Sequence, residues 1–407
     1  MKNGLKVNNI ILNKYIMKKY TGLLIFLFLN VISIEVLFAQ PNKKDTNNVK
    51  VYYEQGMYGG WPANNGIWIW GNEILVGFTK GFYKDLGPTL HNMDREKPEL
   101  HLLGRSLDGG ETWNVEDPGK TGGMVRSGIF MAVPRTDLPQ QASRDFTKAI
   151  NFEHPDFALT TDTKRGLSRF WYSYDRGHTW NGPFDLPNFG AKGTAARTDY
   201  IIDHEKECTM FITVSKENGQ EGRSICIRTT NGGESWSRVS LIGSEPKGYS
   251  IMPASVRISE NEILVLVRNR EENKSWIEGY LSKDNGQTWA HLNNPVEDTG
   301  VGNPPALVKM TDGRICLIYG YRADEGSILA KTKTSDIRAK ISNDNGITWS
   351  RDYILRNDGS GQDIGYPRVV QRPDGKIVAI YYFMDKETGP ERYIGATIWS
   401  PPAMGTE

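Results

Sequence analysis

Short apolar stretches recur along the chain and are separated by polar turns rich in Gly, Asn and Asp. Each stretch is about six residues long and is dominated by Ile, Leu, Val, Phe and Tyr, which favours buried strands. The clearest are residues 73–78, 157–161, 210–214, 262–267, 314–319 and 376–381. The pattern predicts an all-β fold built from one repeated unit.

A second pattern of eight residues falls between these stretches. Each copy places a hydroxyl residue, an Asp or Asn, and a Gly in a tight turn, and it ends on a Trp that closes the turn by burying its ring. The five copies are Ser106–Trp113, Ser173–Trp180, Thr229–Trp236, Ser282–Trp289 and Ser342–Trp349. Because neighbouring copies are 53 to 67 residues apart, the period indicates repeats that bury their apolar faces against one another.

The eight-residue pattern resembles the Asp box, S-x-D-x-G-x-T-W, of sialidases and other bacterial neuraminidase repeat proteins, which are β-propellers. The resemblance implies a six-bladed β-propeller with five Asp-box turns, and seven blades are the alternative. The last blade, around Tyr366 to Trp399, has no box. In that family the boxes are structural turns on the face opposite the active site. A short strand, Val49 to Tyr53, is expected to close the ring by pairing with the last repeat.

The N-terminus has the features of an export signal. Basic residues up to Lys19 precede the apolar run Leu23 to Leu29, and Ala39 stands at a plausible cleavage point. We therefore expect a signal peptide at 1–39, a polar linker at 40–48 and a single propeller domain at 49–407. A membrane anchor is the alternative reading of the apolar run. The mature protein is expected in the periplasm or outside the cell, with no membrane insertion after signal cleavage.

Charge and cysteine content exclude several classes of partner. The net charge is +1 and the pI about 7.7, so no global field favours nucleic acid. One disulfide between Cys208 and Cys226 stays open, because the two fall on neighbouring predicted strands and Cys316 is left over. No spacing suggests a zinc site, so we expect no metal ligands and no cofactor, although a channel calcium ion stays open. We expect a monomer.

The blade starts and the connections that follow the second strands should open on one face, here called the mouth, opposite the boxes. Trp61, Met252, Asn303 and Tyr366 occupy equivalent positions at blade starts, and each directly precedes a Pro. Guanidinium groups for an anion and aromatic rings for stacking suit an anionic oligosaccharide. The residues predicted to bind such a substrate are Trp61, Asn64, Lys80, Arg126, Arg197, Arg268, Asn303, Arg322 and Arg368.

The sialidase site itself is only partly matched. The first arginine of that family aligns with Trp61, and the glutamate that polarises the catalytic tyrosine aligns with Met252. Arg268 is similar to the second arginine, and Tyr366 is similar to the tyrosine. No residue takes the third arginine position unless Arg338 serves there. The aspartate that acts as acid and base has no counterpart directly before the first box, where Asp94 lies further back and Glu99 nearby.

These departures argue against sialidase activity and favour a rebuilt carbohydrate site. The leading hypothesis is β-elimination from a uronic acid, of lyase or dehydratase type, with Tyr366 and His91 moving the protons. An exo-glycoside hydrolase that uses Asp94 or Glu99 as acid is the first alternative. A non-catalytic glycan-binding propeller is the second.

Overall fold

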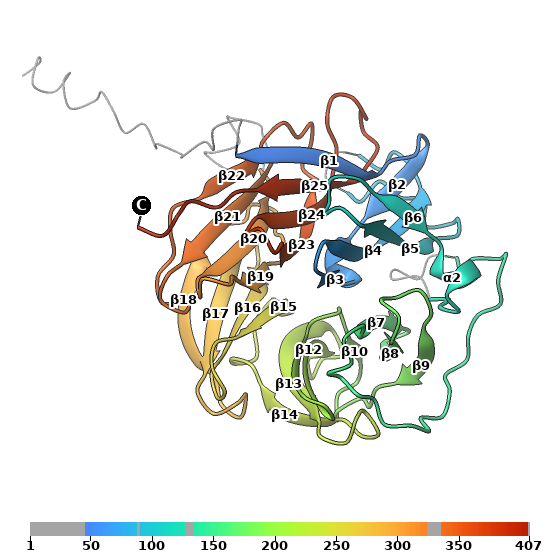
Figure 1. Ribbon diagram of the computed structural model, residues 1–407, viewed down its shortest axis with the longest axis vertical. Helices are drawn as coiled ribbons and strands as arrows, with labels where there is room; N and C mark the ends of the chain where they lie inside the picture. The colour runs from blue at the N-terminus through green and yellow to red at the C-terminus, as the bar shows by residue number, and fades with distance from the viewer. Residues whose placement is uncertain (1–44, 88–89, 127–132, 324–334, 406–407) are drawn as a thin grey trace, which may run out of the picture. The chain divides into compact units, whose positions relative to one another are not determined.

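A computed structural model describes residues 45–87, 90–126, 133–323 and 335–405. The signal peptide prediction and most of the linker lie outside these ranges. The described residues form one compact unit, and its six antiparallel sheets succeed one another around a centre as six blades (Figure 1). The predicted six-bladed β-propeller is confirmed. Among the described residues, no helix is long and apolar enough to cross a membrane.

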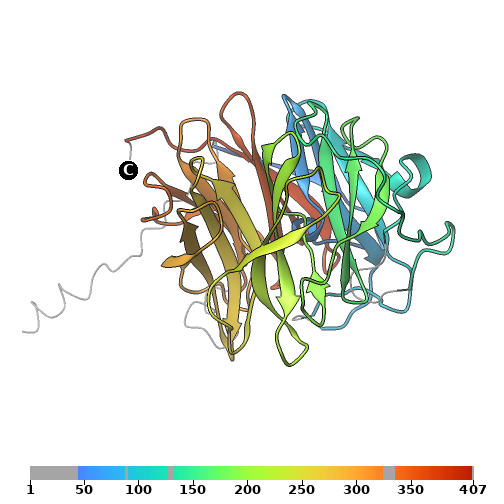
Figure 2. The same ribbon diagram turned by 90° about the horizontal axis from the view of Figure 1, so that it is seen from below.

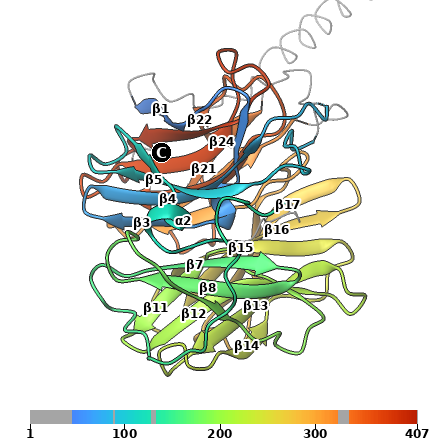
Figure 3. The ribbon, with the colours of Figure 1, turned by 90° about the vertical axis from the view of Figure 1, so that its right-hand side faces the viewer.

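The first two blades contain the only helical turns of the described ranges. Figure 3 shows the second sheet beside the first. Blade one consists of β2 (Met57–Gly60), η1 (Pro62–Asn64), β3 (Ile67–Trp70), β4 (Glu73–Phe82), β5 (Leu100–Ser106) and β6 (Asn114–Glu116). Helix α2 (Pro118–Thr121) leads to blade two, which consists of β7 (Ala158–Lys164), β8 (Leu167–Ser173) and β9 (Asn181–Asp185). Blade two therefore has three strands within the described residues.

Blades three to five repeat a four-layer order of strands from the channel outwards. Blade three has β10 (Thr194–Ala195) and β11 (Tyr200–His204), then β12 (Glu207–Ser215), β13 (Glu221–Thr229) and β14 (Ser237–Leu241). Blade four has β15 (Tyr249–Arg257), β16 (Ile263–Glu271), β17 (Lys274–Ser282) and β18 (Ala290–Val296). Blade five has β19 (Ala306–Lys309), β20 (Ile315–Tyr321), β21 (Asp336–Ser342) and β22 (Tyr353–Arg356). Figure 2 shows these sheets side by side.

The N-terminal strand closes the ring. Blade six consists of β23 (Gly365–Gln371), β24 (Ile377–Phe383) and β25 (Tyr393–Trp399), and β1 (Thr46–Tyr52) pairs with β25 as its outermost strand. The expected closure is confirmed, although the strand begins at Thr46, inside the predicted linker. Hydrogen bonds between the two ends of the chain therefore hold the first and last blades together.

Five of the predicted apolar stretches lie in the second strand layer of a blade, and the sixth, at 157–161, lies largely in β7, the first described strand of blade two. The cores lie between successive sheets. Ile74, Val76 and Phe78 of β4, for example, share one buried cluster with Val378 and Ile380 of β24. Burying such a side chain stabilises the folded protein by about 1.5–3 kcal/mol. The fold is consequently held by contacts between blades, as the repeat pattern predicted.

The Asp boxes form the predicted turns between third and fourth strands. In the first box, Asp108 Oδ1 accepts the Thr112 N–H at 2.9 Å, and the Trp113 ring N–H donates to the Gly110 carbonyl at 2.9 Å. The first box also contacts the residue that directly precedes β4, because the Gly109 N–H donates to the Asn72 carbonyl. The other ends of the second strands therefore open on the opposite face, which is the mouth.

The three cysteines are buried and unpaired. Cys208 and Cys226 do lie on adjacent strands, but Cys226 pairs with Phe211 and Cys208 with Thr229 in the sheet register. The two residues are therefore offset along the strands, and the disulfide that the sequence left open does not form.

Candidate functional site

Three blade starts share an unusual backbone conformation. Trp61, Met252 and Tyr366 have φ values of 58°, 54° and 49°, in the left-handed region, and each directly precedes a proline. A residue of this kind costs about 1–3 kcal/mol and persists where the surroundings enforce it, often at functional sites. The predicted equivalence of these positions is confirmed for the three. The three strained residues all lie at blade starts, on the mouth face.

Tyr366 is the second residue of β23, and two arginines lie next to it. Its phenolic oxygen accepts a hydrogen bond of 2.9 Å from Arg268 Nη1, and the Arg322 guanidinium carbon lies 5.3 Å from its ring centre. Its N–H donates to Asn303 Oδ1 at 2.9 Å. Burial alone would raise the pKa of Tyr366, but the charges of Arg268 and Arg322 outweigh it and lower that pKa. The side chain is thereby prepared to act as a base.

His91 lies beside Tyr366 and is held by Asp363. Its Nδ1 is 2.7 Å from Asp363 Oδ1, and its ring centre is 6.0 Å from that of Tyr366. The Trp61 ring meets the imidazole edge to face at 5.1 Å. The structure therefore brings the predicted proton carrier and the tyrosine together at the mouth. The histidine side chain keeps 20% of its surface exposed.

Within the described ranges, Asp363 is the carboxylate that contacts His91, and it is almost completely buried. Arg322 Nη2 donates to it at 3.3 Å and Arg392 Nε at 3.2 Å. Burial would raise the pKa of Asp363, but His91, Arg322 and Arg392 hold it far below the usual range. With Arg268, three guanidinium groups and a histidine stand against one carboxylate. The group is therefore electropositive at neutral pH and suits an anion.

Two further predicted residues clamp η1 across the channel. Arg197 Nε donates to Asn64 Oδ1 at 3.0 Å, and Arg368 donates to the Ala63 carbonyl. Blades three and six therefore both hold the turn that Trp61 begins. These arginines support the position of Trp61, and Trp61 in turn contacts His91.

Three predicted residues bond partners outside the Tyr366 group. Lys80 Nζ lies 2.6 Å from Glu54, and Asp94 lies 3.4 Å from Lys84 Nζ. Arg126 is buried, where Nη1 donates to Asn65 Oδ1 at 2.7 Å. Burial lowers the pKa of Arg126 to about 10, so it still carries its charge at neutral pH. In this structure these side chains serve local pairing.

Some members of the group were missed from the sequence. Asp363 precedes Tyr366 by three residues, and Tyr382 directly follows the last predicted apolar stretch; its hydroxyl donates to Asp363. Arg392 lies in the connection between β24 and β25. Each could have been suspected only from its position at a strand end on the mouth face, because none belongs to a recognised motif.

The hypothesis that Arg338 takes the third arginine position is not supported by its contacts. Arg338 lies within β21 and pairs with Asp336 at 2.8 Å and with Asp352 at 3.2 Å. Arg322, directly after β20, is the arginine that contacts both Tyr366 and Asp363. The two guanidiniums next to the tyrosine are therefore Arg268 and Arg322.

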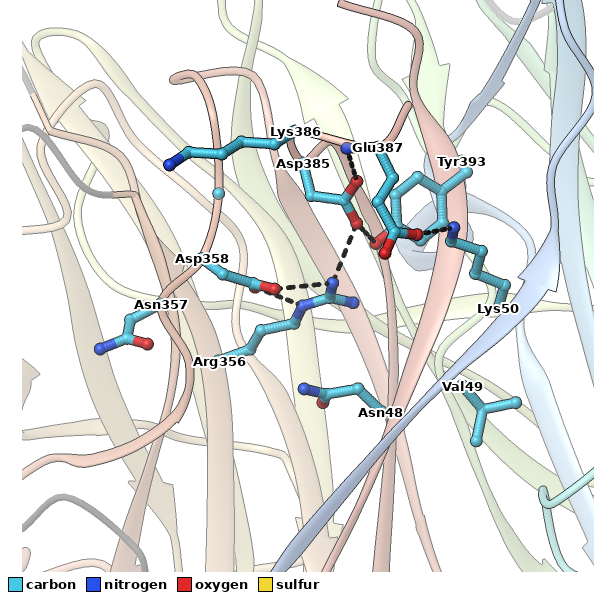
Figure 4. A pocket seen from close by; sticks show the side chains of 11 residues that line it. Asn48, Val49, Lys50, Arg356, Asn357, Asp358, Asp385, Lys386, Glu387 and Tyr393 are labelled. Carbon is cyan, nitrogen blue, oxygen red and sulfur yellow. Dashed lines mark hydrogen bonds and ion pairs between the residues drawn. The ribbon is translucent and has the colours of Figure 1, made fainter. Parts of the chain in front are cut away.

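A separate cavity is lined by residues outside this group. It has a volume of about 570 Å³ and lies beside β22, β1 and the start of β25 (Figure 4). Its charges are paired internally: Arg356 contacts Asp358 at 2.6 Å and Asp385 at 3.1 Å, and Lys50 contacts Glu387 at 2.7 Å. Because its positive and negative side chains neutralise one another, this cavity attracts an anion less strongly than the residues around Tyr366 do. Within the described ranges, no three His, Cys, Asp or Glu side chains are grouped to hold a metal ion.

Known families and structures agree with the fold. Residues 157–379 match the BNR repeat-like domain family. No curated protein matches the sequence. A Dyadobacter fermentans protein of unknown function is 16% identical, with a TM-score of 0.63 over 88% of this chain and 100% of the other.

Two sialidases have similar structures at lower identity. A Trypanosoma rangeli sialidase mutant with trans-sialidase activity is 11% identical, with a TM-score of 0.55 over 88% of this chain. The chain spans 59% of that protein. The NanB sialidase from Streptococcus pneumoniae is 12% identical, with a TM-score of 0.53 over 90% of this chain and 72% of the other. Likeness at these identities concerns the fold alone.

Proposed function

Because the chain belongs to the BNR repeat-like domain family, as a sialidase-like propeller that has diverged from the sialidases, we propose that it is an exported carbohydrate-active enzyme. Its substrate is the end of an acidic, uronate-containing oligosaccharide, and its reaction is β-elimination. The pairing of Tyr366 with Arg268, directly beside His91 and Asp363, carries this proposal. It places two proton-transfer groups in one electropositive site.

Elimination needs a base, an acid and a counter-charge for the uronate carboxylate. With its pKa lowered, the Tyr366 phenolate takes the proton from C5, and the C5–H electron pair forms the C4=C5 double bond. The bond from C4 to its oxygen substituent breaks, and protonated His91 donates a proton to that oxygen. The excess of guanidinium groups stabilises the negative charge that develops next to the carboxylate.

Hydrolysis of the sialidase type is the main alternative, and the solved sialidases of similar fold favour it. The residues argue against it. Met252 takes the position expected for the glutamate, and its sulfur lies 3.9 Å from Arg268 Nη1. A thioether cannot draw a proton from Tyr366, and Asp94 is bonded to lysines at the edge of the loop. Glycan binding without turnover is the remaining alternative.

The test uses the chain from Gln40 onwards, which contains all six sheets. It is incubated with uronate oligosaccharides, with and without sulfate, and with sialosides, and products are followed by ultraviolet absorbance and mass spectrometry. We expect a conjugated C4=C5 product that absorbs in the ultraviolet. A saturated product that has gained water would instead establish hydrolysis.

Two variants complete the test. Tyr366→Phe removes the base and should abolish turnover, whereas Tyr174→Phe, in the second Asp box on the face opposite the mouth, should leave turnover unchanged. Equal binding of one oligosaccharide by wild type and Tyr366→Phe, with no product from either, would replace the enzyme proposal by a glycan-binding role.

A further inference from the structure

Asp363 lies in the connection between β22 and β23, and side chains from several blades converge on its carboxylate at the mouth. Five side chains hydrogen bond to its carboxylate, and they come from blades one, five and six and from the β4–β5 loop. They are Tyr58, His91, Arg322, Tyr382 and Arg392. With 3% of its surface exposed, Asp363 is bound almost entirely by protein.

The protonation state of this carboxyl decides which nitrogen of His91 carries a proton. Against the effect of burial, His91, Arg322 and Arg392 hold the pKa of Asp363 far below its usual range, so the group is a carboxylate and can only accept hydrogen bonds. His91 Nδ1, 2.7 Å away, must therefore be the donor. In the neutral imidazole the lone pair is then on Nε2.

The same short segment also fixes Tyr366. The carbonyl of Ile364 accepts hydrogen bonds from Arg322 Nε at 2.8 Å and from Asn303 Nδ2 at 2.9 Å. Asn303 Oδ1 in turn accepts the Tyr366 N–H. Residues 363 to 366 therefore connect the histidine and the tyrosine through one short, hydrogen-bonded piece of backbone.

We propose that Asp363 is a positioning residue that keeps His91 protonated on Nδ1, so that Nε2 is the nitrogen that exchanges protons with the substrate. This proposal rests on the proposed function for the identity of the reaction. In the elimination, the imidazolium gives its Nε2 proton to the leaving oxygen and becomes the neutral Nδ1–H form, which is the tautomer that Asp363 stabilises. Before the next cycle Tyr366 releases to water the proton that it took from C5, and the imidazole takes up a proton from water, so that both groups return to their starting forms.

The first test needs no substrate. Nitrogen-15 NMR of labelled histidines distinguishes a protonated ring nitrogen from a bare one, and the signals of His91 are those that disappear in His91→Gln. We expect neutral His91 in wild type to show a protonated Nδ1 and a bare Nε2. The opposite tautomer, or an even mixture of the two, would overturn the proposal whatever the protein's activity.

The second test uses Asp363→Asn. We expect the preference for Nδ1–H to weaken, and turnover to fall by about 10²-fold, the lower end of what general acid–base catalysis contributes. KM should change much less, because the asparagine alters proton transfer more than binding. A turnover within about twofold of wild type, in a folded variant, would refute the positioning role.

A matched control separates this role from the loss of a buried charge. Asp162 is also buried and pairs with Arg169 at 3.0 Å, in blade two. Asp162→Asn should reduce stability while the His91 nitrogen signals stay as in wild type. If both variants moved those signals alike, the effect would be general and the assignment to Asp363 wrong. If no substrate of the panel is turned over, only the proposed function fails, since the NMR result stands on its own.

Discussion

Arg268 Nη1 donates to the phenolic oxygen of Tyr366 over 2.9 Å, although the two residues are 98 positions apart in the sequence. Arg268 lies near the end of β16 and Tyr366 at the start of β23, so the bond crosses the mouth between blades four and six. A guanidinium that donates to a phenol stabilises the ionised form. The relationship therefore determines at what pH this tyrosine can serve as a base.

Replacement of Arg268 by Met should raise the pKa of Tyr366. Burial raises the pKa, and the attraction that now outweighs burial comes first from Arg268 and then from Arg322. Ultraviolet difference titration of wild type against Tyr366→Phe isolates this residue. We expect ionisation below the usual tyrosine range in wild type, and at higher pH in Arg268→Met measured against Arg268→Met/Tyr366→Phe.

Tyr58 supplies the comparison within the same group. It is also buried and bonds to Asp363, but burial and that carboxylate raise its pKa well above the usual value. Its difference spectrum against Tyr58→Phe should show no ionisation at the pH where Tyr366 titrates. Identical titration of the two tyrosines would contradict the electrostatic account.

Asp199 should make the stability of the protein depend on pH in an unusual direction. It lines a cavity of about 280 Å³ beside Ser255 and Arg368, and burial raises its pKa to about 6. A carboxyl whose pKa is raised on folding contributes stability below its unfolded pKa and loses it as the pH rises through about 6. Asn cannot ionise, so Asp199→Asn should show no such loss.

The measurement is the free energy of unfolding of both proteins by denaturant. Between about pH 4 and about pH 7, the difference between Asp199→Asn and wild type should change by about 2 kcal/mol in favour of the variant. The comparison uses the change of this free-energy difference with pH, because an effect of the substitution on Arg368 that does not depend on pH cancels. A difference that is flat over this interval would show that Asp199 ionises normally.

The sequence predicted the features that depend on neighbours along the chain. The apolar second strands, the Asp-box turns and the closing strand beginning near Val49 follow from local patterns, and all are confirmed. The equivalence of Trp61 and Tyr366 follows from the proline after each. Tyr366, His91, Arg268 and Arg322 meet at the mouth because each stands at a strand end or in a loop on that face.

What the sequence could not predict are pairings between distant blades. Asp363 is 272 residues from His91 and 41 from Arg322, and nothing in its own surroundings marks it. Arg126 is placed at a blade start, but Asn65 and a backbone carbonyl bind its guanidinium. Which partner an arginine binds depends on side-chain geometry across the channel, and no periodicity records it.

The cysteines should be unreactive in the folded protein. All three are buried, and burial raises the pKa of Cys226 and Cys316 to about 12 and that of Cys208 well above its usual value. Because the thiolate is the reactive form, a thiol reagent should label none of them in the native state and all three in denaturant. Fewer than three labelled thiols in denaturant without reductant would indicate a disulfide.

Gly365→Ala should disrupt the mouth more than an equal change elsewhere. Gly365 has a φ of 101°, and a Cβ there would lie 2.3 Å from Asn303 Nδ2, the amide that holds the segment before Tyr366. Gly375 also has a positive φ, 84°, but a Cβ there meets nothing within 4 Å. Both variants carry a backbone cost of about 1 kcal/mol, and the clash adds about 1–3 kcal/mol at Gly365 alone.

Denaturant unfolding should therefore distinguish the two variants, and only Gly365→Ala should raise the pKa of Tyr366. Equal losses of stability, with an unchanged tyrosine titration, would mean that Asn303 does not fix this segment.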